Sequence, residues 1–257
     1  MEIDKHKKQF GNLAEDYTKY RRPYDSKLFE LLFSVAGREN KKILDIACGT
    51  GKSTESLVGE NTEVYGCDHD PLMIAEAKKQ AELKNLNIDY RVADVEHLPF
   101  PDGEFDIVTV GTAFHWFVNE AAMSEIWRVL KPDTVLFVFW TLTVKDVPEE
   151  DSIPGTFFAK FNWEKVPKEL RNLDHISNFF SENNFENIST AHIPVVHKYT
   201  VEEYVGLMKT ASSFGVLSHE DKGIFVHELT ALLTEKLGSR EKFVLEDELQ
   251  VVYGFKK

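Results

Sequence analysis

Short apolar runs alternate along this chain with longer segments in which apolar residues recur every three to four positions. The apolar runs predict β-strands at 43–47, 62–67, 88–92, 105–111, 134–141, 186–197 and 243–255. The periodic segments predict helices at 26–36, 52–59, 71–84, 119–130, 174–183, 200–210 and 219–237. Strands that alternate with helices are typical of a doubly wound α/β sheet. Residues 143–170 hold three prolines among acidic and aromatic residues and predict an irregular excursion.

The first predicted strand ends in the most informative segment, ILDIACGTG at 43–51. Asp45 comes near the end of the strand, and the small residues Ala47, Gly49 and Gly51 alternate after it. Because glycine has no Cβ, the backbone can turn tightly there and approach a ligand closely. The helix predicted next would add free N–H groups and the positive end of a dipole. The segment therefore predicts a turn that holds a nucleotide-like ligand.

Spacing separates three ligands that such a turn can hold. GTGKST at 49–54 looks like the end of a P-loop, but that motif needs a glycine five positions before Gly51, where Ile46 stands. A dinucleotide fingerprint needs its third glycine where the chain has Thr54. An acidic residue followed by alternating small residues is the pattern of an adenosylmethionine turn. In this pattern the chain resembles the class I S-adenosylmethionine-dependent methyltransferases, and the other two interpretations remain weaker alternatives.

A second strand end carries an acid at the spacing of this family. The strand in TEVYGCDHDPLMI ends at Asp68, 23 residues after the first acid. An acid there can accept hydrogen bonds from both hydroxyls of a ribose, although a dinucleotide enzyme would place a similar acid. The resemblance implies that Asp68 binds the ribose, with His69 beside it and Leu72 or Met73 packed near the adenine.

The third and fourth predicted strands frame a stretch characteristic of the family, LPFPDGEFD at 98–106. Asp94 follows the third strand, and the resemblance implies that its carboxylate accepts a hydrogen bond from the adenine amino group. The Val95 N–H would donate to a ring nitrogen. Gly111 and Thr112, where the fourth strand ends, would pass beside the methionine part of the cofactor.

The fourth strand then runs into the pair His115 and Trp116. Ligands of open α/β sheets bind at strand tips near a topological switch point, so we expect both side chains to bind the acceptor. His115 is the candidate catalytic residue, with an orienting or structural histidine as the alternative. SEIWRVLKPD at 124–133 matches the helix before the family's fifth strand, with Asp133 in place of the usual glycine.

The resemblance also implies the fold and the domain organisation. We expect a Rossmann-like methyltransferase fold, an α/β doubly wound seven-stranded sheet that is mostly parallel and has a closing antiparallel hairpin. The whole chain, 1–257, would be a single domain. Its parts would be an N-terminal helical lid at 1–40, a cofactor-binding core at 41–142, and a substrate-side half at 143–257 with a helical insertion at about 199–240.

The N-terminal segment FGNLAEDYTKYRRPYDSKLFELL resembles a segment that folds over the cofactor in small-molecule methyltransferases. The resemblance implies cofactor contacts from Tyr20 and Arg21 and a substrate contact from Tyr17. An arginine could bind the cofactor carboxylate through two parallel hydrogen bonds. A surface charge on an amphipathic helix is the alternative for Arg21.

Composition narrows the partners. The net charge is −13: residues 1–42 have 10 Lys/Arg against 7 Asp/Glu, and the remainder has 20 against 36. A nucleic-acid methyltransferase needs a basic face, so we expect a small-molecule substrate and no nucleic acid. The two cysteines fit neither a disulfide framework nor a zinc site, and no metal is expected. No apolar run is long enough for a membrane span or marks a secretory signal, so we expect a cytoplasmic protein; its oligomeric state stays open.

The cofactor dictates the chemistry, because a sulfonium methyl is already electrophilic and the enzyme mainly holds the acceptor in line with it. A carboxylate acceptor needs no base, whereas His115 is the candidate base for a hydroxyl or an amine. The HW pair and the N-terminal RP segment resemble a subgroup that includes trans-aconitate methyltransferases, which favours a small carboxylate. An adenosylmethionine-binding regulatory protein without turnover is the alternative from another class, and a nicotinamide-dependent dehydrogenase is a weaker one.

Overall fold

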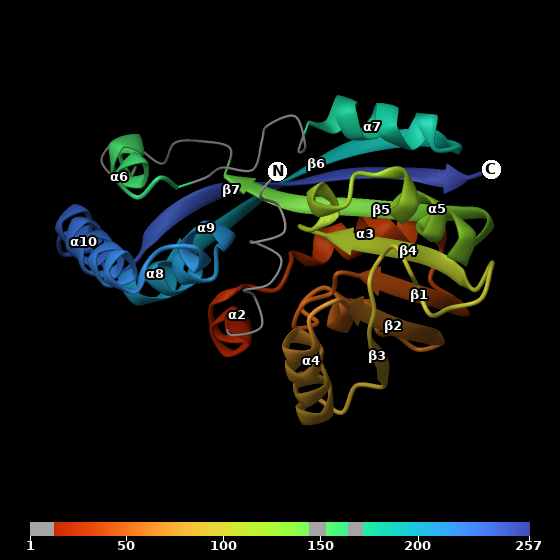
Figure 1. Ribbon diagram of the computed structural model, residues 1–257, viewed down its shortest axis with the longest axis horizontal. Helices are drawn as coiled ribbons and strands as arrows, with labels where there is room; N and C mark the ends of the chain where they lie inside the picture. The colour runs from red at the N-terminus through yellow and green to blue at the C-terminus, as the bar shows by residue number, and fades with distance from the viewer. Residues whose placement is uncertain (1–12, 144–152, 164–171) are drawn as a thin grey trace. The chain divides into compact units, whose positions relative to one another are not determined.

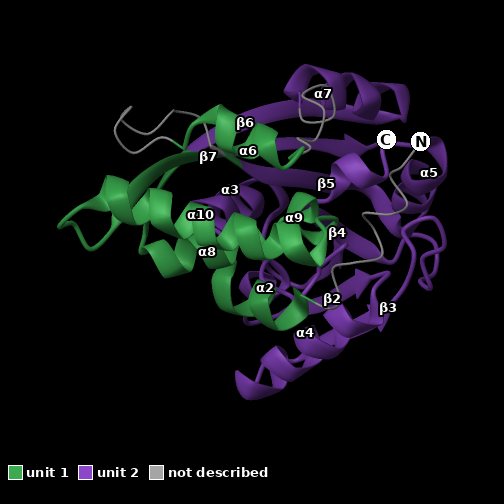
Figure 2. Ribbon diagram, turned by 60° about the vertical axis from the view of Figure 1, so that its left-hand side comes forward, with its two compact units in different colours: residues 1–21, 142–165, 194–248 green, residues 22–141, 166–193, 249–257 purple. Residues whose placement is uncertain are grey.

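The computed structural model of the protein describes residues 13–143, 153–163 and 172–257 (Figure 1). The chain divides into two compact units (Figure 2). Unit 1 comprises residues 1–21, 142–165 and 194–248, and unit 2 comprises residues 22–141, 166–193 and 249–257. The predicted single domain, with its lid, core and substrate-side half, stays a prediction.

The strands form one seven-stranded sheet in the order β3-β2-β1-β4-β5-β7-β6. Their bounds are β1 (Lys41–Ile46), β2 (Thr62–Asp68), β3 (Ile88–Val92), β4 (Phe105–Gly111), β5 (Leu130–Thr143), β6 (Phe185–Tyr199) and β7 (Phe243–Lys256). Strands β1 to β5 pair in parallel, and β6 and β7 form the closing antiparallel hairpin. The expected mostly parallel, Rossmann-like α/β sheet is confirmed.

The central strands agree with prediction because both of their faces are buried. Ile43 and Leu44 of β1 are fully buried, as are Ile107 and Val108 of β4. A parallel strand covered on both faces reads as a continuous apolar run, which marks it clearly in the sequence. The predicted bounds 88–92 and 105–111 are those of β3 and β4.

Six of the nine α-helices in the described part of the chain begin at a capping side chain. The bounds of all nine are α2 (Ala14–Tyr20), α3 (Ser26–Ala36), α4 (Pro71–Leu83), α5 (Glu120–Val129), α6 (Gly155–Lys160), α7 (Leu173–Glu182), α8 (Val201–Lys209), α9 (Ser212–Gly215) and α10 (His219–Leu237). The capping side chains accept hydrogen bonds from first-turn N–H groups, and they belong to Asp25, Asp70, Asn119, Asn172, Thr200 and Ser218. Of the helices in the described part of the chain, none combines the length and apolar character that crossing a membrane requires.

Two predictions of local structure are wrong. The helix predicted at 52–59 is a short 3-10 helix, η2 (Thr54–Leu57), and the preceding Ser53 does not cap it. The excursion at 143–170 is not wholly irregular, since it contains α6. Its segments 144–152 and 164–171 lie outside the described residues.

The order of the strands positions the site. Strands β1 and β4 are neighbours, and the connection that leaves β1 leads to β2 while the connection that leaves β4 leads to β5, on the opposite side. Such a switch point opens a crevice at the carboxyl ends of the strands, where ligands of open α/β sheets bind. In unit 2 this edge carries the segments 45–51, 68–70, 92–95 and 111–116.

Unit 1 has its own aromatic core. Phe225 of α10 is fully buried there, and the Trp163 ring stacks on it with centroids 4.9 Å apart. Phe157 and Phe158 of α6 pack around the same ring. These aromatic residues therefore build a core cluster in unit 1.

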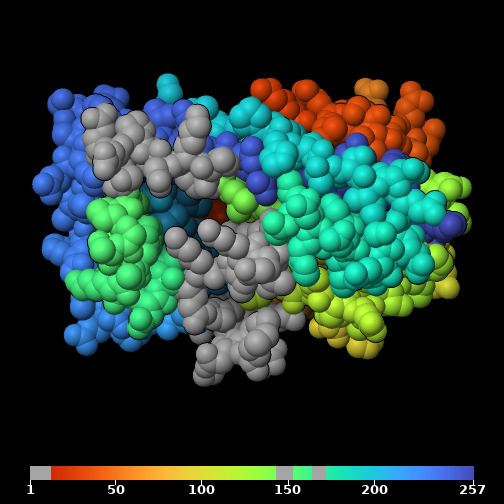
Figure 3. All heavy atoms as spheres, turned by 90° about the horizontal axis from the view of Figure 1, so that it is seen from above, coloured from red at the N-terminus to blue at the C-terminus, as the bar shows by residue number. Residues whose placement is uncertain are grey.

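In unit 2, helix α7 covers part of the sheet, and its side chains, drawn in teal, form part of the surface in Figure 3. Its Phe180 is fully buried against Phe114 and Phe185. Near the end of the chain, the Lys256 ammonium donates hydrogen bonds to the carbonyls of Trp127 (2.8 Å) and Leu130 (2.7 Å). Lys256 thereby caps the C-terminal end of α5, where carbonyls lack partners within the helix.

We expect Lys256→Met to lower the free energy of unfolding by about 2–3 kcal/mol, because two carbonyls lose a charged donor. Urea denaturation followed by circular dichroism measures the change. Lys257→Met is the matched control, since the Lys257 side chain is 73% exposed and pairs only with the exposed Glu186 in the described structure. Equal midpoints for the two variants would contradict the capping role of Lys256.

Candidate active site

Backbone hydrogen bonds hold the strand ends of unit 2 in register at the switch point. The Cys48 N–H donates to the Cys67 carbonyl (3.0 Å), and the Ala93 N–H donates to the Asp68 carbonyl (2.9 Å). These bonds tie the turn after β1 to the end of β2, and the end of β2 to the turn after β3. The three turns that carry the predicted acids therefore lie side by side.

The alternating small residues of the glycine turn have a common backbone conformation. Ala47 (φ 54°), Gly49 (φ 54°) and Gly51 (φ 84°) all lie in the left-handed region. That region is unstrained for glycine and costly for residues with a Cβ. The alternation in the sequence is thus a requirement of the turn, and Ala47 adopts the conformation at the cost of some strain.

Gly51 is also required by packing inside the protein. A Cβ at this position would overlap the hydroxyl group of Tyr90, a buried residue of β3, and would contact Ala77 of α4 at 3.6 Å. The sequence suggested only that glycine lets a ligand approach. The structure gives Gly51 an additional role, which is to let the turn pack against Tyr90.

Asp45 is fully buried beneath the turn. Its Oδ2 accepts hydrogen bonds from the hydroxyls of Ser53 (2.6 Å) and Thr54 (2.7 Å), and its Oδ1 accepts one from Thr109 (2.8 Å). Burial raises the pKa of Asp45, an effect that outweighs the three hydrogen bonds, which lower it. Asp45 therefore bonds to protein hydroxyls that hold the turn to β1 and β4.

Asp68 lies at the end of β2 with 7% of its surface exposed. Its Oδ2 accepts a hydrogen bond from the Gly49 N–H, and its Oδ1 accepts one from the Asp70 N–H, both at 2.9 Å. His69 Nδ1 lies 3.2 Å from Oδ1. Asp68 thus joins the glycine turn to the start of α4, and it keeps lone pairs for a further donor.

Asp94 is exposed and stands two residues after the end of β3. Its Oδ1 accepts a hydrogen bond from the Glu96 N–H (3.0 Å), so the residue shapes a turn around Val95. A carboxylate has four lone-pair sites, and this bond leaves capacity for an amine donor.

Two exposed apolar side chains flank the acids. Leu72, in the first turn of α4, and Val92, which is paired with Asp68 across the strands, are each 53% exposed. Met73 is only 3% exposed because it lies on the inner side of α4. Of the two residues proposed to contact adenine, Leu72 is the one at the surface.

Tyr24, which the sequence analysis did not single out, helps to shape the turn after β4. Thr112 has φ 57°, a rare conformation for a β-branched residue, and its hydroxyl lies 2.8 Å from that of Tyr24. The Tyr24 ring packs edge-on against Phe139, 4.8 Å between centroids. A Cβ on Gly111 would meet Phe139 at 2.9 Å. Tyr24 stands in the N-terminal segment that contains Tyr17 and Tyr20, and nothing in the local sequence marks it above those tyrosines.

His115 and Trp116 lie on a single turn, the 3-10 helix η3 (Phe114–Trp116). Phe114 is 1% exposed and packs against Phe117 and Phe180, which anchors the turn in the core. The His115 and Trp116 side chains are half-buried, with ring centroids 4.7 Å apart. The anchor holds a titratable ring and an indole at the tip of β4.

The three predicted N-terminal residues belong to unit 1, where α2 packs against α8. The Tyr20 ring occupies the space that a Cβ on Gly206 would fill. Arg21 Nε donates to Thr210 Oγ1 (2.9 Å), and its guanidinium lies 5.1 Å from the centroid of the Tyr17 ring. Within unit 1 these residues attach α2 to α8, and their contacts with cofactor or substrate stay predictions.

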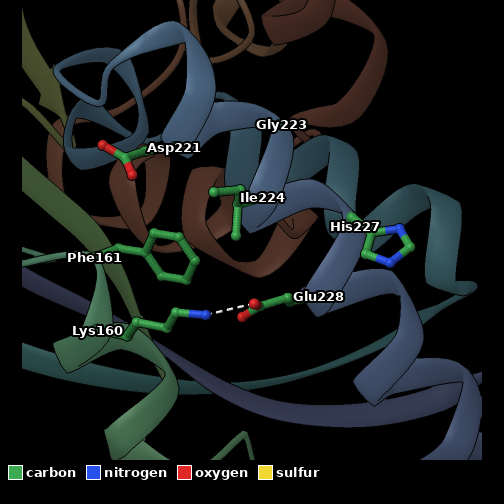
Figure 4. A pocket seen from close by; sticks show the side chains of 7 residues that line it. All are labelled: Lys160, Phe161, Asp221, Gly223, Ile224, His227 and Glu228. Atoms are coloured by element: carbon green, nitrogen blue, oxygen red, sulfur yellow. Dashed lines mark hydrogen bonds and ion pairs between the residues drawn. The ribbon is translucent and has the colours of Figure 1, made fainter.

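A groove of about 520 Å³ lies in unit 1 between α6 and α10 (Figure 4). Lys160 pairs with Glu228 across it, and Phe161 and Ile224 supply apolar surface. None of the predicted site residues lines it. The groove is therefore distinct from the acids and turns at the switch point of unit 2.

The segments that form the switch point in unit 2 also match known proteins. A family model described as a methyltransferase domain matches residues 44–138. An uncharacterised methyltransferase of Schizosaccharomyces pombe is 30% identical over 223 residues, 85% of this chain and 84% of that protein. The demethylmenaquinone methyltransferase of Thermus thermophilus is 43% identical over 101 residues, 38% of this chain and 46% of that protein. The structure of a type II methyltransferase candidate from Anaeromyxobacter dehalogenans is similar in fold, with TM-score 0.67 and 20% identity over 93% of this chain and 98% of that one.

We expect Gly51→Ala to lower the free energy of unfolding by about 3 kcal/mol, because the new Cβ adds steric overlap with Tyr90 to backbone strain. Gly103→Ala is the matched control: Gly103 has φ 61° but nothing lies within 4 Å of its Cβ position, so the variant has backbone strain alone. Its expected loss is about 1 kcal/mol. Equal losses in urea denaturation would contradict the packing role of Gly51.

Proposed function

Because the chain belongs to the class I S-adenosylmethionine-dependent methyltransferases, we propose that it transfers a methyl group from S-adenosylmethionine to a small-molecule acceptor. The cofactor would bind at the carboxyl edge of unit 2, with its adenosine across the ends of β2 and β3. The acceptor would lie by the tip of β4. Family membership sets aside the P-loop and dinucleotide interpretations.

The observation that carries the proposal is the grouping of acidic and apolar side chains at two adjoining strand ends. Asp68 and Asp94 offer acceptor oxygens, which suit the ribose hydroxyls and the adenine amine. Leu72 and Val92 offer exposed apolar surface beside them, which suits the two faces of a purine. Leu72 thus replaces Met73 in the proposed adenine contact.

The remaining cofactor contacts are proposed from position. The turn through Ala47, Gly49 and Gly51 would carry the methionine part, because its left-handed residues bring the backbone close to a ligand. Thr112 would line the same part from β4. Val95 and His69 would border the adenosine, and the cofactor contacts of Tyr20 and Arg21 stay predictions from the sequence.

Two observations bear on the acceptor: the net charge of the chain, and the share of the chain that matches relatives of known name. The chain has a net charge of −13 and no basic stretch comparable to a nucleic-acid-binding face, which favours a small molecule. The demethylmenaquinone relative matches only 38% of the chain, so its acceptor does not transfer to this protein. A small carboxylate remains the acceptor that we propose.

The bound cofactor supplies an electrophilic methyl group, so this chain's residues have two tasks. The first task is to hold the acceptor in line with the methyl group, which residues at the tip of β4 would do. This positioning lowers the entropic part of the activation barrier. Trp116 would supply a flat apolar wall, and the substrate contact of Tyr17 stays a prediction from the sequence. His115 would orient a carboxylate by donating a hydrogen bond, or would take the proton of a hydroxyl or an amine.

We expect Asp68→Asn to weaken S-adenosylmethionine binding by about 1–3 kcal/mol, because a charge-assisted hydrogen bond to the ribose is lost. Isothermal titration calorimetry measures the change. Asp70→Asn is the matched control, since it removes a neighbouring charge while asparagine still caps α4. A dissociation constant within twofold of wild type for folded Asp68→Asn would refute the ribose contact.

His115→Asn distinguishes the acceptor chemistries. For a carboxylate acceptor, asparagine still donates a hydrogen bond, so kcat should fall only modestly and its pH profile should keep its shape. For a hydroxyl or amine acceptor, loss of the base should cost about 10²–10⁴ in rate and remove the acid limb of the profile. We expect the first result, since carboxylates are ionised near neutral pH without help. Steady-state kinetics across pH 5–9, with methyl acceptors screened by mass spectrometry, measure both.

A further inference from the structure

The segment that follows the proposed adenine contact is anchored to α5 by Arg128 and by Glu125, whose carboxylate accepts a hydrogen bond from the Leu98 N–H at 2.8 Å. Arg128 donates to the carbonyls of Phe100 (2.8 Å) and Leu98 (3.1 Å) and to the carboxylate of Asp102 (2.8 Å). It also forms a two-point pair with Glu125, at 2.6 and 2.8 Å. All five guanidinium N–H groups are thereby used, so residues 98–102 are fixed to α5.

The start of the same segment is attached to α5 by a different residue. Asn119 caps the helix, because its Oδ1 accepts a hydrogen bond from the Ala122 N–H at 2.9 Å. Its amide nitrogen donates to Glu96 Oε1 at 3.2 Å. The Glu96 N–H in turn donates to Asp94 Oδ1. Asn119 is thus one residue away from the acid proposed to bind adenine.

Asn119 is equally close to the acceptor side. Its own N–H donates to the Phe117 carbonyl at 2.8 Å, and the Phe117 N–H donates to Phe114 at 3.1 Å. These bonds close the turn that carries His115 and Trp116. One side chain and its backbone therefore connect the turn after β3 with the turn after β4, all within unit 2.

Asn119 both caps α5 and donates a hydrogen bond to Glu96, and this combination explains why an amide side chain is found at this position. Serine, threonine or aspartate would cap α5 about as well as asparagine. Only asparagine among these cap residues also has an N–H₂ group with which to donate to Glu96. Capping alone leaves the amide nitrogen unexplained, and the contact with Glu96 accounts for it.

We propose that Asn119 is a positioning residue that fixes the adenine-binding turn relative to the His115–Trp116 turn. Cofactor binding at the first turn thereby changes the position of the second turn, which binds the acceptor. This inference rests on the proposed function, since it takes Asp94 as a cofactor contact. Coupling between two binding sites is reciprocal, so the acceptor affects cofactor affinity by the same factor.

The test uses the full chain and S-adenosylhomocysteine, which binds without turnover. Asn119→Ser keeps an N-cap and loses the donor to Glu96, and Glu96→Ala removes the partner from the other side. Both should raise the dissociation constant about three- to tenfold, the scale of one ordinary hydrogen bond lost at a solvent-accessible position. Glu96→Gln keeps an acceptor oxygen and should restore most of the affinity.

A second reading reports the acceptor side. Subtracting the fluorescence of Trp116→Phe isolates the Trp116 signal from those of the other three tryptophans. S-Adenosylhomocysteine should change this signal in the wild type and in Glu96→Gln, and should leave it nearly unchanged in Asn119→Ser and Glu96→Ala. A merely structural cap would not produce that pattern.

Asn172→Ser is the matched control, because Asn172 caps α7 of the same unit through its Oδ1. It should match the wild type in affinity and in the Trp116 response. Wild-type behaviour of both Asn119→Ser and Glu96→Ala would overturn the coupling while leaving the proposed function intact. Failure of the wild type itself to bind S-adenosylhomocysteine would instead overturn the proposed function.

Discussion

The site depends on one buried carboxylate, that of Asp45. Charged groups are costly to bury, by several kcal/mol even in a relaxed protein, and the raised pKa of Asp45 records that cost. Hydroxyls from Ser53, Thr54 and Thr109 converge on the carboxylate and reduce that cost. These donors come from the turn after β1 and from β4, so the carboxylate joins the elements on either side of the switch point.

Other features of the carboxyl edge follow from that junction. With the turn held down at Ser53 and Thr54, the backbone of Gly49 is presented to Asp68, whose oxygens then join β2 to the turn. Hydrogen bonding between β2 and β3 brings Asp94 alongside. The three acids differ accordingly in environment: the first is enclosed by protein donors, the second is partly committed, and the third is exposed. Accessibility to a ligand increases in the order of the chain.

Much of the fold could be predicted because buried positions are occupied by apolar residues in recognisable patterns. Parallel strands covered on both faces are continuous apolar runs, and capped helices such as α3 and α10 begin at recognisable side chains. The prediction of a helix at 52–59 was wrong, and the structure shows side-chain contacts there that the local sequence does not reveal. Ser53 and Thr54 look like capping residues, yet their hydroxyls bond to Asp45 eight and nine positions earlier.

The candidate site was predictable as a set of turns but not as a set of contacts. The sequence located the acids by spacing, whereas choosing between Leu72 and Met73 requires the rotation of α4 about its axis. Tyr24 and Asn119 were missed because their partners, Thr112 and Glu96, lie 88 and 23 residues away. No local pattern records a long-range hydrogen bond between polar side chains.

The position of Lys256 has a consequence for how the protein is made. Helix α5 leaves the ribosome more than 120 residues before the ammonium group that caps its last carbonyls. Unit 2 is interrupted twice in the sequence by segments of unit 1, and its residues 249–257 emerge last. Domains generally fold as units during synthesis, starting from the N-terminus. Unit 2 therefore cannot be completed before its segment 249–257 has been made, and the edge of β5 that pairs with β7 stays unpaired until β7 is synthesised.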